Sequence, residues 1–499
     1  MKLHIIRSIS WLFITIVSVT LSTSCLAYDL ENMVQSYTLD NGLKVLIVER
    51  HFSPTVAFYI RYNVGAVNES SNYTGTAHFL EHMLFKGTQT IGTTNYREEA
   101  KILKKIHNVI ETLDTEKMKG ENADLQKVDV YTRELAQLRK RADTFVIENE
   151  IDRLYTENGG ADLNASTGYD LTSYHVSLPS NKIELWARIE SDRMNNPVFR
   201  SFFSERNVVI EERRQTVESK PPRKLMEQFL ATAFTLHPYR RPILGWKSEM
   251  PFLNLTYMRH FFKIYHSPNN TVIAVVGDVS PPDVMKIIIR YFGGIAPQEI
   301  PPSHIPVEPP QQGERRIELV ADSNPEIMIG YHKPTLPSSD DYAFDIIDII
   351  LSKGRTSRLY TKLINVEELA ASITTINGFP ASRYPNLFLL HAAPRYPHTA
   401  KEVEQSIYEE IERLKREAVS ARELKKAKTQ LKADFIRGLK SNSGLASMLS
   451  YFEAIAGDYH YITDHIKTVE KITTADIMEV AKKYLIAENR TVAILVQKQ

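Results

Sequence analysis

Residues 74 to 87 read TGTAHFLEHMLFKG, and this stretch decides how the rest of the chain is interpreted. At its centre, HFLEH places two histidines four positions apart, so in a helix His78 and His82 lie one turn apart on the same face. Two imidazoles at this spacing can bind one zinc ion. Glu81 lies beside them, too close in sequence to be simply a third ligand, and is placed to take a proton from a water on the metal.

The local sequence also predicts where this helix begins and ends. Thr76 is a suitable N-cap and Gly87 a suitable stop. The five-residue pattern alone does not establish a metal site, because a single histidine on a helix is more often a surface or core residue than a ligand. A catalytic zinc ion needs three protein ligands, so the third has to come from elsewhere in the chain.

Two glutamates on a later helix are the candidates for the missing ligand. Residues 201–219 have helical spacing, and within them Glu205 and Glu212 lie seven positions apart, two turns along one face. Glu211 points away from that face. Of the two neighbouring acids, Glu212 is therefore the better candidate to share a binding partner with Glu205. A charged helix face without a ligand is the ordinary explanation for such carboxylates, and only the histidine motif favours the metal.

The beginning of the chain has the features of a secretory signal. Lys2 and Arg7 precede an apolar run over residues 11–21, and Cys25-Leu26-Ala27 has the small residues that a signal peptidase requires. We interpret residues 1–27 as a cleaved signal, which predicts a periplasmic or secreted protein. Two alternatives stay open: acylation of Cys25 in a lipoprotein, and a retained membrane anchor, although the run is short for a bilayer span.

The composition excludes several classes of function. Of the 499 residues, 43% are hydrophobic and 24% charged, which is typical of a soluble globular protein of roughly two to four domains. Loss of Lys2 and Arg7 leaves 59 of the 61 Lys and Arg residues against 60 Asp and Glu, and a net charge of about −1 indicates no nucleic-acid partner. The only cysteine, Cys25, leaves with the signal, which excludes cysteine as a nucleophile or metal ligand. No membrane association is expected unless Cys25 is lipidated.

The order of the predicted elements divides the mature chain into two halves. We expect an N-terminal domain over residues 28–296, in which a half-buried strand at 56–62 precedes the histidine helix. Six prolines indicate a linker over 297–313. Residues 314–499 then repeat the order of strands and helices without a metal motif. The fold class is α+β, with two homologous α/β-sandwich halves, each a mostly antiparallel sheet with helices packed on one side.

Two further segments of the first half have their own patterns. Residues 97–155 show helical spacing in two parts and predict an antiparallel helical hairpin that projects from the domain, which we interpret as a solvated insertion without chemistry. Residues 159–179, rich in Thr, Tyr and Ser, predict two short strands. One of these is either an edge strand that can pair with an extended peptide or part of an ordinary hairpin within the sheet.

Six short motifs follow one another along the chain: GTAHFLEHMLFKGT at 75–88, NAST at 164–167 with Tyr174, ESDRM at 190–194, ERNVVIEE at 205–212, HPY at 237–239 and GDV at 277–279. Their order and spacing resemble the M16 (insulinase or pitrilysin-like) zinc metallopeptidases. The resemblance is greatest to half-length bacterial members related to mitochondrial processing peptidase.

The resemblance implies roles for individual residues. It implies that His78, His82 and Glu212 are the ligands of one zinc ion (Zn²⁺) per chain and that Glu81 is the general base. Glu205 resembles the second family carboxylate, which supports the site without binding the metal.

The resemblance also implies a mode of substrate binding and a partner. Asn164 and Ala165 fall on the substrate-binding edge strand of the family. The second half departs from the family pattern, because the positions that hold the substrate with an Arg and a Tyr are here Ile364 and Ala371. We therefore expect a second M16-like chain to supply the missing pair, in a heterodimer that closes around the peptide or in a homodimer.

The expected activity is that of a zinc endopeptidase acting on short or unfolded peptides. A zinc-bound water activated by Glu81 would attack the scissile carbonyl of a peptide that lies extended along the edge strand. Two other interpretations stay open: a non-catalytic M16 homologue acting as a structural or binding subunit, and a metal-binding module without turnover.

Overall fold

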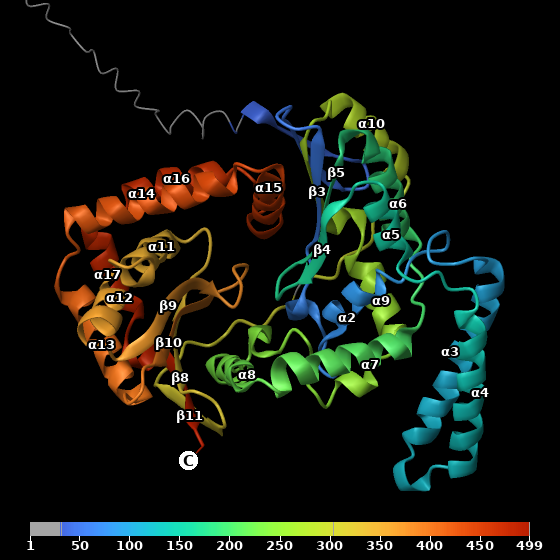
Figure 1. The fold of residues 1–499 in the computed structure, drawn as a ribbon, viewed down its shortest axis with the longest axis horizontal. Coiled ribbons are helices and arrows are strands. Elements are labelled where there is room, and N and C mark those ends of the chain that lie inside the picture. Colours follow the sequence, from blue (N-terminus) through green and yellow to red (C-terminus); the bar gives the residue numbers. More distant parts are fainter. Residues whose placement is uncertain (1–29, 31, 303, 499) are drawn as a thin grey trace, which may run out of the picture.

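The computed structural model describes residues 30, 32–302 and 304–498, which form two halves joined by a segment without helix or strand (Figure 1). The signal predicted at residues 1–27, including Cys25, lies outside the described residues. None of the described helices is both long and apolar enough to cross a lipid bilayer.

A six-stranded sheet forms the centre of the first half. Its strands are β1 (Val34–Thr38), β2 (Lys44–Glu49), β3 (Thr55–Tyr62), β4 (Ala161–Thr167), β5 (Thr172–Pro179) and β6 (Thr271–Gly277). They lie in the order β1-β2-β6-β3-β5-β4, and every neighbouring pair is antiparallel except β2 and β6. Among the described strands β4 pairs with β5 alone, so β4 is an edge strand.

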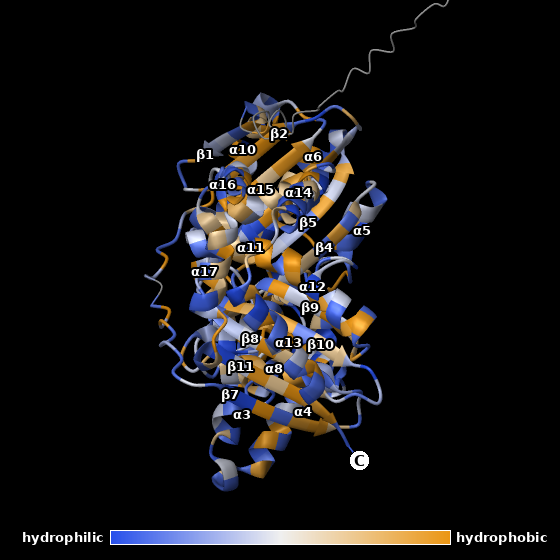
Figure 2. Cartoon of the chain, turned by 90° about the vertical axis from the view of Figure 1, so that its left-hand side faces the viewer, coloured by the Kyte–Doolittle hydropathy of each residue, from blue (hydrophilic) through white to orange (hydrophobic). Residues whose placement is uncertain are grey.

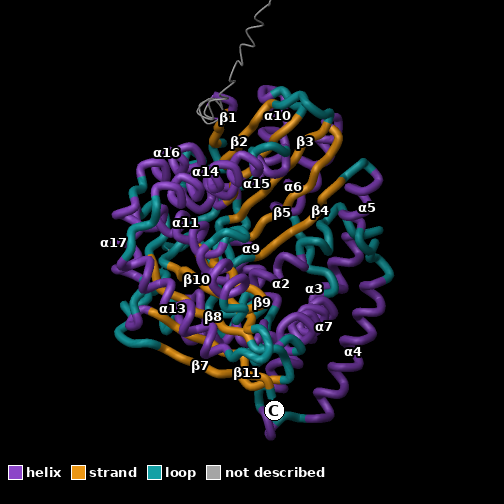
Figure 3. Tube along the Cα trace, turned by 60° about the vertical axis from the view of Figure 1, so that its left-hand side comes forward, coloured by secondary structure: helices purple, strands orange, loops and turns teal. Residues whose placement is uncertain are grey.

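A five-stranded sheet forms the centre of the second half. Its strands are β7 (Arg315–Ala321), β8 (Glu326–Lys333), β9 (Ala370–Phe379), β10 (Asn386–Pro394) and β11 (Arg490–Gln497). Their order is β7-β11-β8-β10-β9, with a parallel pair only between β7 and β11 (Figure 3). Apart from β1, the two sheets have the same sequence of parallel and antiparallel neighbours, as the prediction of two homologous α+β halves requires.

Helices cover both sheets. In the first half they are α2 (Thr76–Met83), α3 (Tyr96–Lys117), α4 (Leu125–Asp143), α5 (Glu150–Glu157), α6 (Ile183–Asn195), α7 (Phe202–Arg213), α8 (Pro221–Ala233), α9 (Leu255–Tyr265) and α10 (Pro281–Phe292). In the second half they are α11 (Ser339–Ser352), α12 (Arg358–Tyr360), α13 (Ala400–Arg416), α14 (Ala421–Gly438), α15 (Asn442–Ala456), α16 (Tyr461–Lys471) and α17 (Thr474–Tyr484). The helix predicted at 201–219 is present as α7, and a π-helical turn continues it over Arg214–Glu218.

Strand β3 is buried on both faces. Phe58 stacks on Trp186 of α6, with 4.3 Å between the ring centroids. Ala57 and Tyr59 point to the opposite face, where they pack against α15 from the second half. The prediction of a half-buried strand at 56–62 is therefore wrong, because a helix from the second half covers the face that was expected to be exposed (Figure 1).

The two halves exchange helices across their boundary. While α15 covers β3 and β6 of the first sheet, α8 packs on β7 and β11 of the second. In this second contact Leu225 and Phe229 of α8 are buried together with Met328 and Leu495. Figure 2 shows apolar residues concentrated on the strands and hydrophilic residues on the outer helices. The two halves therefore share a buried boundary.

The helices α3 and α4 form an antiparallel hairpin that projects from the first half (Figure 1). The hairpin has a small core of its own, made of Ile102, Val109, Ile110, Leu113, Leu135, Leu138 and Ala142. At its base, a buried ion pair between Glu99 and Arg200 (2.7 Å) attaches α3 to the segment before α7.

Candidate metal centre

A buried carboxylate outside the motif starts the histidine helix. Glu69 accepts hydrogen bonds from the N–H groups of Gly75 (2.8 Å) and Ala77 (2.7 Å), at the beginning of α2. The prediction that Thr76 is the N-cap is wrong, because its hydroxyl donates to the carbonyl of Tyr73 (2.6 Å) instead. Gly75 has a φ of 88°, a conformation that glycine adopts readily and other residues rarely.

The same helix ends at Met83, four residues before the predicted stop at Gly87. Arg200 donates from Nη1 to the carbonyl of Lys86 (3.0 Å) and from Nη2 to the carbonyl of Thr88 (2.6 Å). After Met83 the N–H groups of Phe85 and Lys86 bond to the carbonyls of His82 and Met83, and Arg200 holds the turn that follows. Gly87, with a φ of 94°, belongs to that turn.

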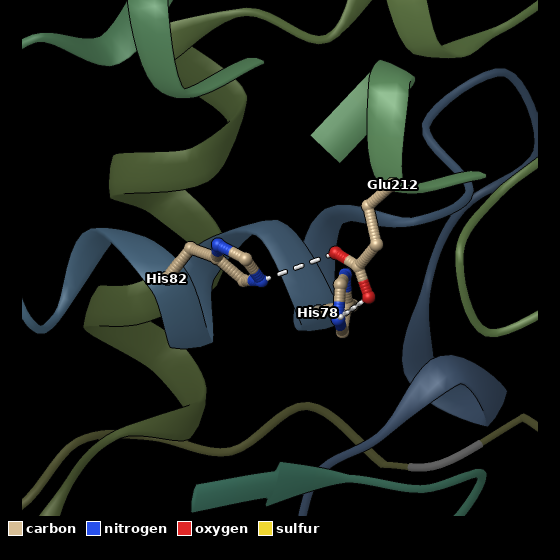
Figure 4. A group of neighbouring side chains, drawn as sticks. All are labelled: His78, His82 and Glu212. Atoms are coloured by element: carbon tan, nitrogen blue, oxygen red, sulfur yellow. Dashed lines mark ion pairs between the residues drawn. The ribbon is translucent and has the colours of Figure 1, made fainter. Parts of the chain in front are cut away.

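Three side chains from two distant helices meet at one point (Figure 4). Nε2 of His78 lies 3.7 Å from one carboxylate oxygen of Glu212, and Nε2 of His82 lies 3.4 Å from the other. One ligand atom from each of the three residues lies within 4.8 Å of the other two. In the described part of the chain, this is the one group of three or more potential ligands that could hold a metal ion.

The donor set fits zinc. Two imidazole nitrogens and one carboxylate oxygen are the ligands of one class of catalytic zinc site, and at bond lengths of about 2.0–2.1 Å neighbouring ligand atoms lie roughly 3.4 Å apart. The two separations involving Glu212, 3.7 and 3.4 Å, each to a different carboxylate oxygen, are close to that value. Oε2 of Glu212 is also buried without a well-formed hydrogen bond. In the metal-free protein its cationic neighbour is Nε2 of His82 at 3.4 Å, a role that a bound metal would take over.

Glu205 fixes the orientation of His82. Its Oε1 accepts a hydrogen bond from Nδ1 of His82 (3.0 Å), and its Oε2 accepts one from Nζ of Lys86 (2.6 Å). Nε2 of His82 is therefore left facing Glu212. A carboxylate behind a metal-binding histidine commonly sets its tautomer and ring orientation. Glu205 thus lies behind the three potential ligands and not among them.

The two histidines have opposite electrostatic environments. Burial lowers the pKa of His78 to about 4, so this imidazole is neutral and able to bind a metal. Burial also acts to lower the pKa of His82, but the carboxylates of Glu205 and Glu212 outweigh it and raise this pKa to about 9. In the metal-free protein at neutral pH, His82 therefore carries a proton that a metal has to displace.

Glu81 lies on α2 beside the potential ligands and is held from β4. Its Oε2 accepts a hydrogen bond from the hydroxyl of Thr167 (2.5 Å), the last residue of that strand. Burial raises the pKa of the Glu81 carboxyl, while the hydrogen bond from Thr167 and the charge of His82 act in the opposite direction. A raised pKa suits a carboxylate that accepts a proton and later returns it.

The two predicted substrate-binding residues lie on the edge strand. Asn164 is exposed and Ala165 half-buried, and they pair across the sheet with His175 and Tyr174 of β5. The outer edge of β4 has no strand partner among the described residues. Strand β4 is therefore an edge strand, and it forms an antiparallel hairpin with β5.

Sequence reasoning placed two positions of the second half near the substrate. Ile364 is half-buried against the second core, in the π-helical segment Thr361–Val366, and Ala371 is exposed on β9. Neither side chain carries a hydrogen-bonding group.

Three supporting residues were missed from the sequence: Glu69, Lys86 and Thr167. Lys86 and Thr167 lie inside quoted motifs, so their positions were available although their contacts were not. Glu69 lies in the loop before the histidine helix and gives no pattern of its own.

Protein-family models match two consecutive parts of the chain. A model described as Insulinase (Peptidase family M16) matches residues 44–116 and 146–247, and one described as Peptidase M16 inactive domain matches residues 253–431. The chain belongs to peptidase family M16. The gap in the first M16 match, at 117–145, covers the connection between α3 and α4 and the whole of α4.

Individual M16 proteins extend this comparison. The zinc protease PqqE of Helicobacter pylori is 25% identical over 477 residues, which cover 94% of each chain. The crystal structure of a protease from Helicobacter pylori has the same fold, with a TM-score of 0.78 and 24% identity over 93% of this chain and 99% of that chain. The periplasmic protease PqqL of Escherichia coli matches with a TM-score of 0.69 and 17% identity, over 93% of this chain but 47% of PqqL. In length, this M16 chain is thus similar to PqqE and to half of PqqL.

Proposed function

We propose that this M16 protein is a zinc-dependent endopeptidase that cleaves short or unfolded peptides. The observation that carries the proposal is the meeting of His78, His82 and Glu212, with Glu81 beside them. All four residues lie in the part of the chain matched by the Insulinase model. The description "inactive domain" belongs to residues 253–431, which contain none of them. A non-catalytic homologue would be expected to lack a ligand or the base.

Each side chain has a separate part in the proposed reaction. Zinc, when held by the three ligands, would polarise the peptide carbonyl and make an attacking water more acidic. Glu81 would accept the proton of that water and return it to the leaving amine. Glu205 holds His82 in the ring orientation that directs Nε2 to the metal position, and Thr167 holds Glu81 through its hydroxyl.

The proposed substrate is an extended stretch of peptide backbone. The outer edge of β4 offers N–H and C=O groups that an added strand would satisfy. Because Thr167 at the end of β4 contacts Glu81, a peptide paired along this edge would lead into the metal centre. Asn164 and Ala165 would lie beside that peptide. A folded protein cannot present a free strand of this kind, so we expect short or unfolded substrates.

A second M16-like chain is part of the proposal. Ile364 and Ala371 stand where the resemblance expects an Arg and a Tyr that hold the substrate. The chain also corresponds to 47% of the length of PqqL, so a second chain of this size would complete an assembly of similar extent. We expect a heterodimer with a chain that carries the missing pair, and a homodimer is the alternative. Co-purification from the native host distinguishes the two.

The proposed site of action is the periplasm or the cell exterior. This part of the proposal rests on the signal-like sequence of residues 1–27. Fractionation of the native host, followed by mass determination of the mature N-terminus, tests it. A chain beginning at Tyr28 supports a cleaved signal, and an acylated Cys25 supports the lipoprotein alternative.

The substitution Glu81→Gln tests the catalytic assignment. We expect the unmodified protein and the Glu81→Gln variant each to bind one zinc ion. In the variant, cleavage of an unstructured fluorogenic peptide should fall by about 10²–10⁴-fold, the usual contribution of general acid–base catalysis. Glu211→Gln is the matched control, because Glu211 lies next to Glu212 but pairs with Arg214 on the surface.

Three outcomes separate the interpretations. Equal cleavage by the Glu81→Gln protein and the unmodified protein contradicts the role of Glu81. Zinc binding without any cleavage, also in the presence of the co-purified partner, favours a metal-binding module. Absence of zinc binding favours a structural or binding subunit.

A further inference from the structure

A cavity of about 780 Å³ opens beside the potential metal ligands and reaches the second half of the molecule. His78 and Glu212 lie in its wall, so a peptide at the metal centre also has access to it. The wall also includes residues of β3 and β5, the turn between β4 and β5, the π-helical turn before α8, α8 itself, residues 242–244, the loop after β9 and α15. The chemistry of this wall therefore bears on which peptides fit.

Arg61 of β3 contributes a guanidinium to the wall without a carboxylate partner. Its Nε, Nη1 and Nη2 donate hydrogen bonds to neutral oxygens at 2.9–3.3 Å, which belong to Ser173, Ser447 and Ser450. Among the described residues, no carboxylate oxygen forms an ion pair with it within 4.0 Å. Five N–H groups are available on a guanidinium, and these bonds use four of them.

Two more cations lie in the same wall. Lys220 and Arg223 are exposed at the start of α8. Neither has a carboxylate oxygen within ion-pair distance among the residues that the structure describes. Burial lowers the pKa of Arg61 to about 10, although Tyr59 and Tyr451 act in the opposite direction.

The carboxylates of the wall are engaged elsewhere. Glu227 pairs with Arg213 at 2.8 Å, and Glu212 faces the two histidines. Asp170 accepts hydrogen bonds from the Tyr239 hydroxyl and from two backbone N–H groups of the loop after β9. None of these three carboxylates forms an ion pair with Arg61, Lys220 or Arg223.

We propose that this cavity is a subsite for a carboxylate group of the peptide substrate and that Arg61 is its specificity-determining residue. The inference rests on the proposed peptidase function. A hydrogen bond between the guanidinium and a substrate carboxylate would supply the missing negative charge at a partly buried site, where such bonds are strong.

The register of the sheet connects this subsite to the edge strand. Arg61 is directly opposite Ser173 of β5, and Ser173 is directly opposite Ser166 of β4. Directly opposed residues share one face of a sheet, and the three side chains are joined by hydrogen bonds of 3.1 and 3.3 Å. A peptide strand added to β4 would continue this row with the residue opposite Ser166. Because Thr167 contacts Glu81, that residue would lie near the scissile bond, within about one or two positions.

The reach of the side chain guides the choice of probe. The guanidinium of Arg61 already extends over β5, which is two strand spacings, roughly 9–10 Å, from a peptide paired with β4. Glutamate spans more of this distance than aspartate. The test therefore uses unstructured fluorogenic peptides that differ only by Glu or Gln at one scanned position, each made with a free C-terminal carboxylate or a C-terminal amide.

The expected result is a preference for the acid. For the zinc-loaded protein with its partner, kcat/KM should be about tenfold or more higher for Glu than for Gln, with the cut at a fixed distance from the acid. If the subsite binds the C-terminal carboxylate of the peptide, kcat/KM should instead be higher for the free acid than for the amide. The cut should then lie at a fixed distance from the C-terminus. Equal rates for all members of the set overturn the proposal.

Variants of Arg61 separate specificity from structure. Arg61→Gln should bring the Glu/Gln ratio close to one, whereas Arg61→Lys should retain a preference. Arg50→Gln is the matched control, because Arg50 also bridges the halves, through the carbonyl of Leu439 (3.2 Å), but does not line the cavity. An acid preference that persists in Arg61→Gln overturns the role of Arg61.

A second variant guards against misfolding. Lys220→Ala combined with Arg223→Ala changes only exposed side chains, and should reduce the Glu/Gln ratio and its dependence on salt. An unchanged ratio in this double variant, together with an unfolded Arg61→Gln protein, counts against the subsite.

Binding keeps this test separate from the test of activity. Affinities of the same peptides for the Glu81→Gln protein, measured by fluorescence anisotropy, should show the same acid preference without any cleavage. Acid-selective binding in a protein that never cleaves peptides supports the subsite and contradicts the proposed peptidase function. Cleavage without an acid preference supports the proposed peptidase function and contradicts the subsite.

Discussion

Replacing Glu205 with Ala should weaken zinc binding without removing a zinc ligand. The substitution deletes the hydrogen bond from Nδ1 of His82 (3.0 Å) and the ion pair with Lys86 (2.6 Å), both made by a side chain that is 12% exposed. Loss of a carboxylate behind a metal-binding histidine costs about 10–100-fold in metal affinity, or about 1.4–2.7 kcal/mol. For Glu205→Ala we expect a loss of zinc affinity near the upper end of this range. Glu205→Gln keeps an acceptor for His82 and should lie near the lower end.

The size of this effect should depend on pH. In the metal-free protein the pKa of His82 is about 9, so at neutral pH zinc has to displace a proton from it. Removal of Glu205 lowers that pKa, which makes the displacement easier and offsets part of the loss. Above pH 9 His82 is neutral in both proteins. The full loss of affinity is therefore expected there, and a smaller loss at neutral pH.

Competition with a chromophoric zinc chelator measures the two dissociation constants. Glu211→Ala is the matched control, since Glu211 is on the same helix but 44% exposed and paired with Arg214 at 2.7 Å. Its zinc affinity should equal that of the unmodified protein. If Glu205→Ala also binds zinc with unchanged affinity above pH 9, Glu205 does not orient a metal-binding histidine.

Two further predictions concern the proton on His82 and the start of α2. The raised pKa of His82 means that its ion pairs stabilise the metal-free protein fully below pH 6.5 and that this contribution is lost as the pH rises through 9. Zinc binding at neutral pH should therefore release about one proton, measured by calorimetry in buffers of different ionisation enthalpy, and a count near zero would contradict the assignment. Glu69→Ala leaves two buried N–H groups without partners and should lower the free energy of unfolding by about 2–4 kcal/mol in urea denaturation. An unchanged urea midpoint would show that these N–H groups find other acceptors.

The existence of the histidine helix could be predicted from the sequence, but not its ends. The spacing of His78 and His82 is a local property that any helix converts into one face. The beginning of α2 depends on Glu69 and the turn after its end on Arg200, both of which lie outside the helix. Caps that come from tertiary structure leave no signal at the positions where a local cap is sought.

Helix α15 of the second half also depends on long-range contacts. Helix α15 begins with Asn442, Ser443 and Gly444, residues with poor helix propensity that read as a loop. The helix forms because it packs on β3 and β6 of the other half. That contact also buries the second face of β3, which is why the prediction of a half-buried strand is wrong.

The same distinction between local and long-range contacts applies to the candidate site. The pair Glu205 and Glu212 could be predicted because seven residues of one helix fix their relation. The contact between Thr167 and Glu81, and the row from Arg61 through Ser173, depend on how strands are paired. Strand register is a long-range property, and the sequence of one strand does not contain it.

The second half contributes no ligand to the metal centre, but it is connected to the helix that carries Glu212. Helix α7 is anchored in the first core by Phe202 at its start and by Val209 near its end. The residue after Glu212, Arg213, pairs with Glu227 of α8 at 2.8 Å, and α8 is packed on the second sheet. The histidines, by contrast, belong to a helix whose buried residues lie in the first core alone. Helix α7 packs on the histidine helix inside the first half, through Phe79 and Phe202 at 4.8 Å, and the second half reaches the residue next to Glu212 only through the ion pair of Arg213 with α8.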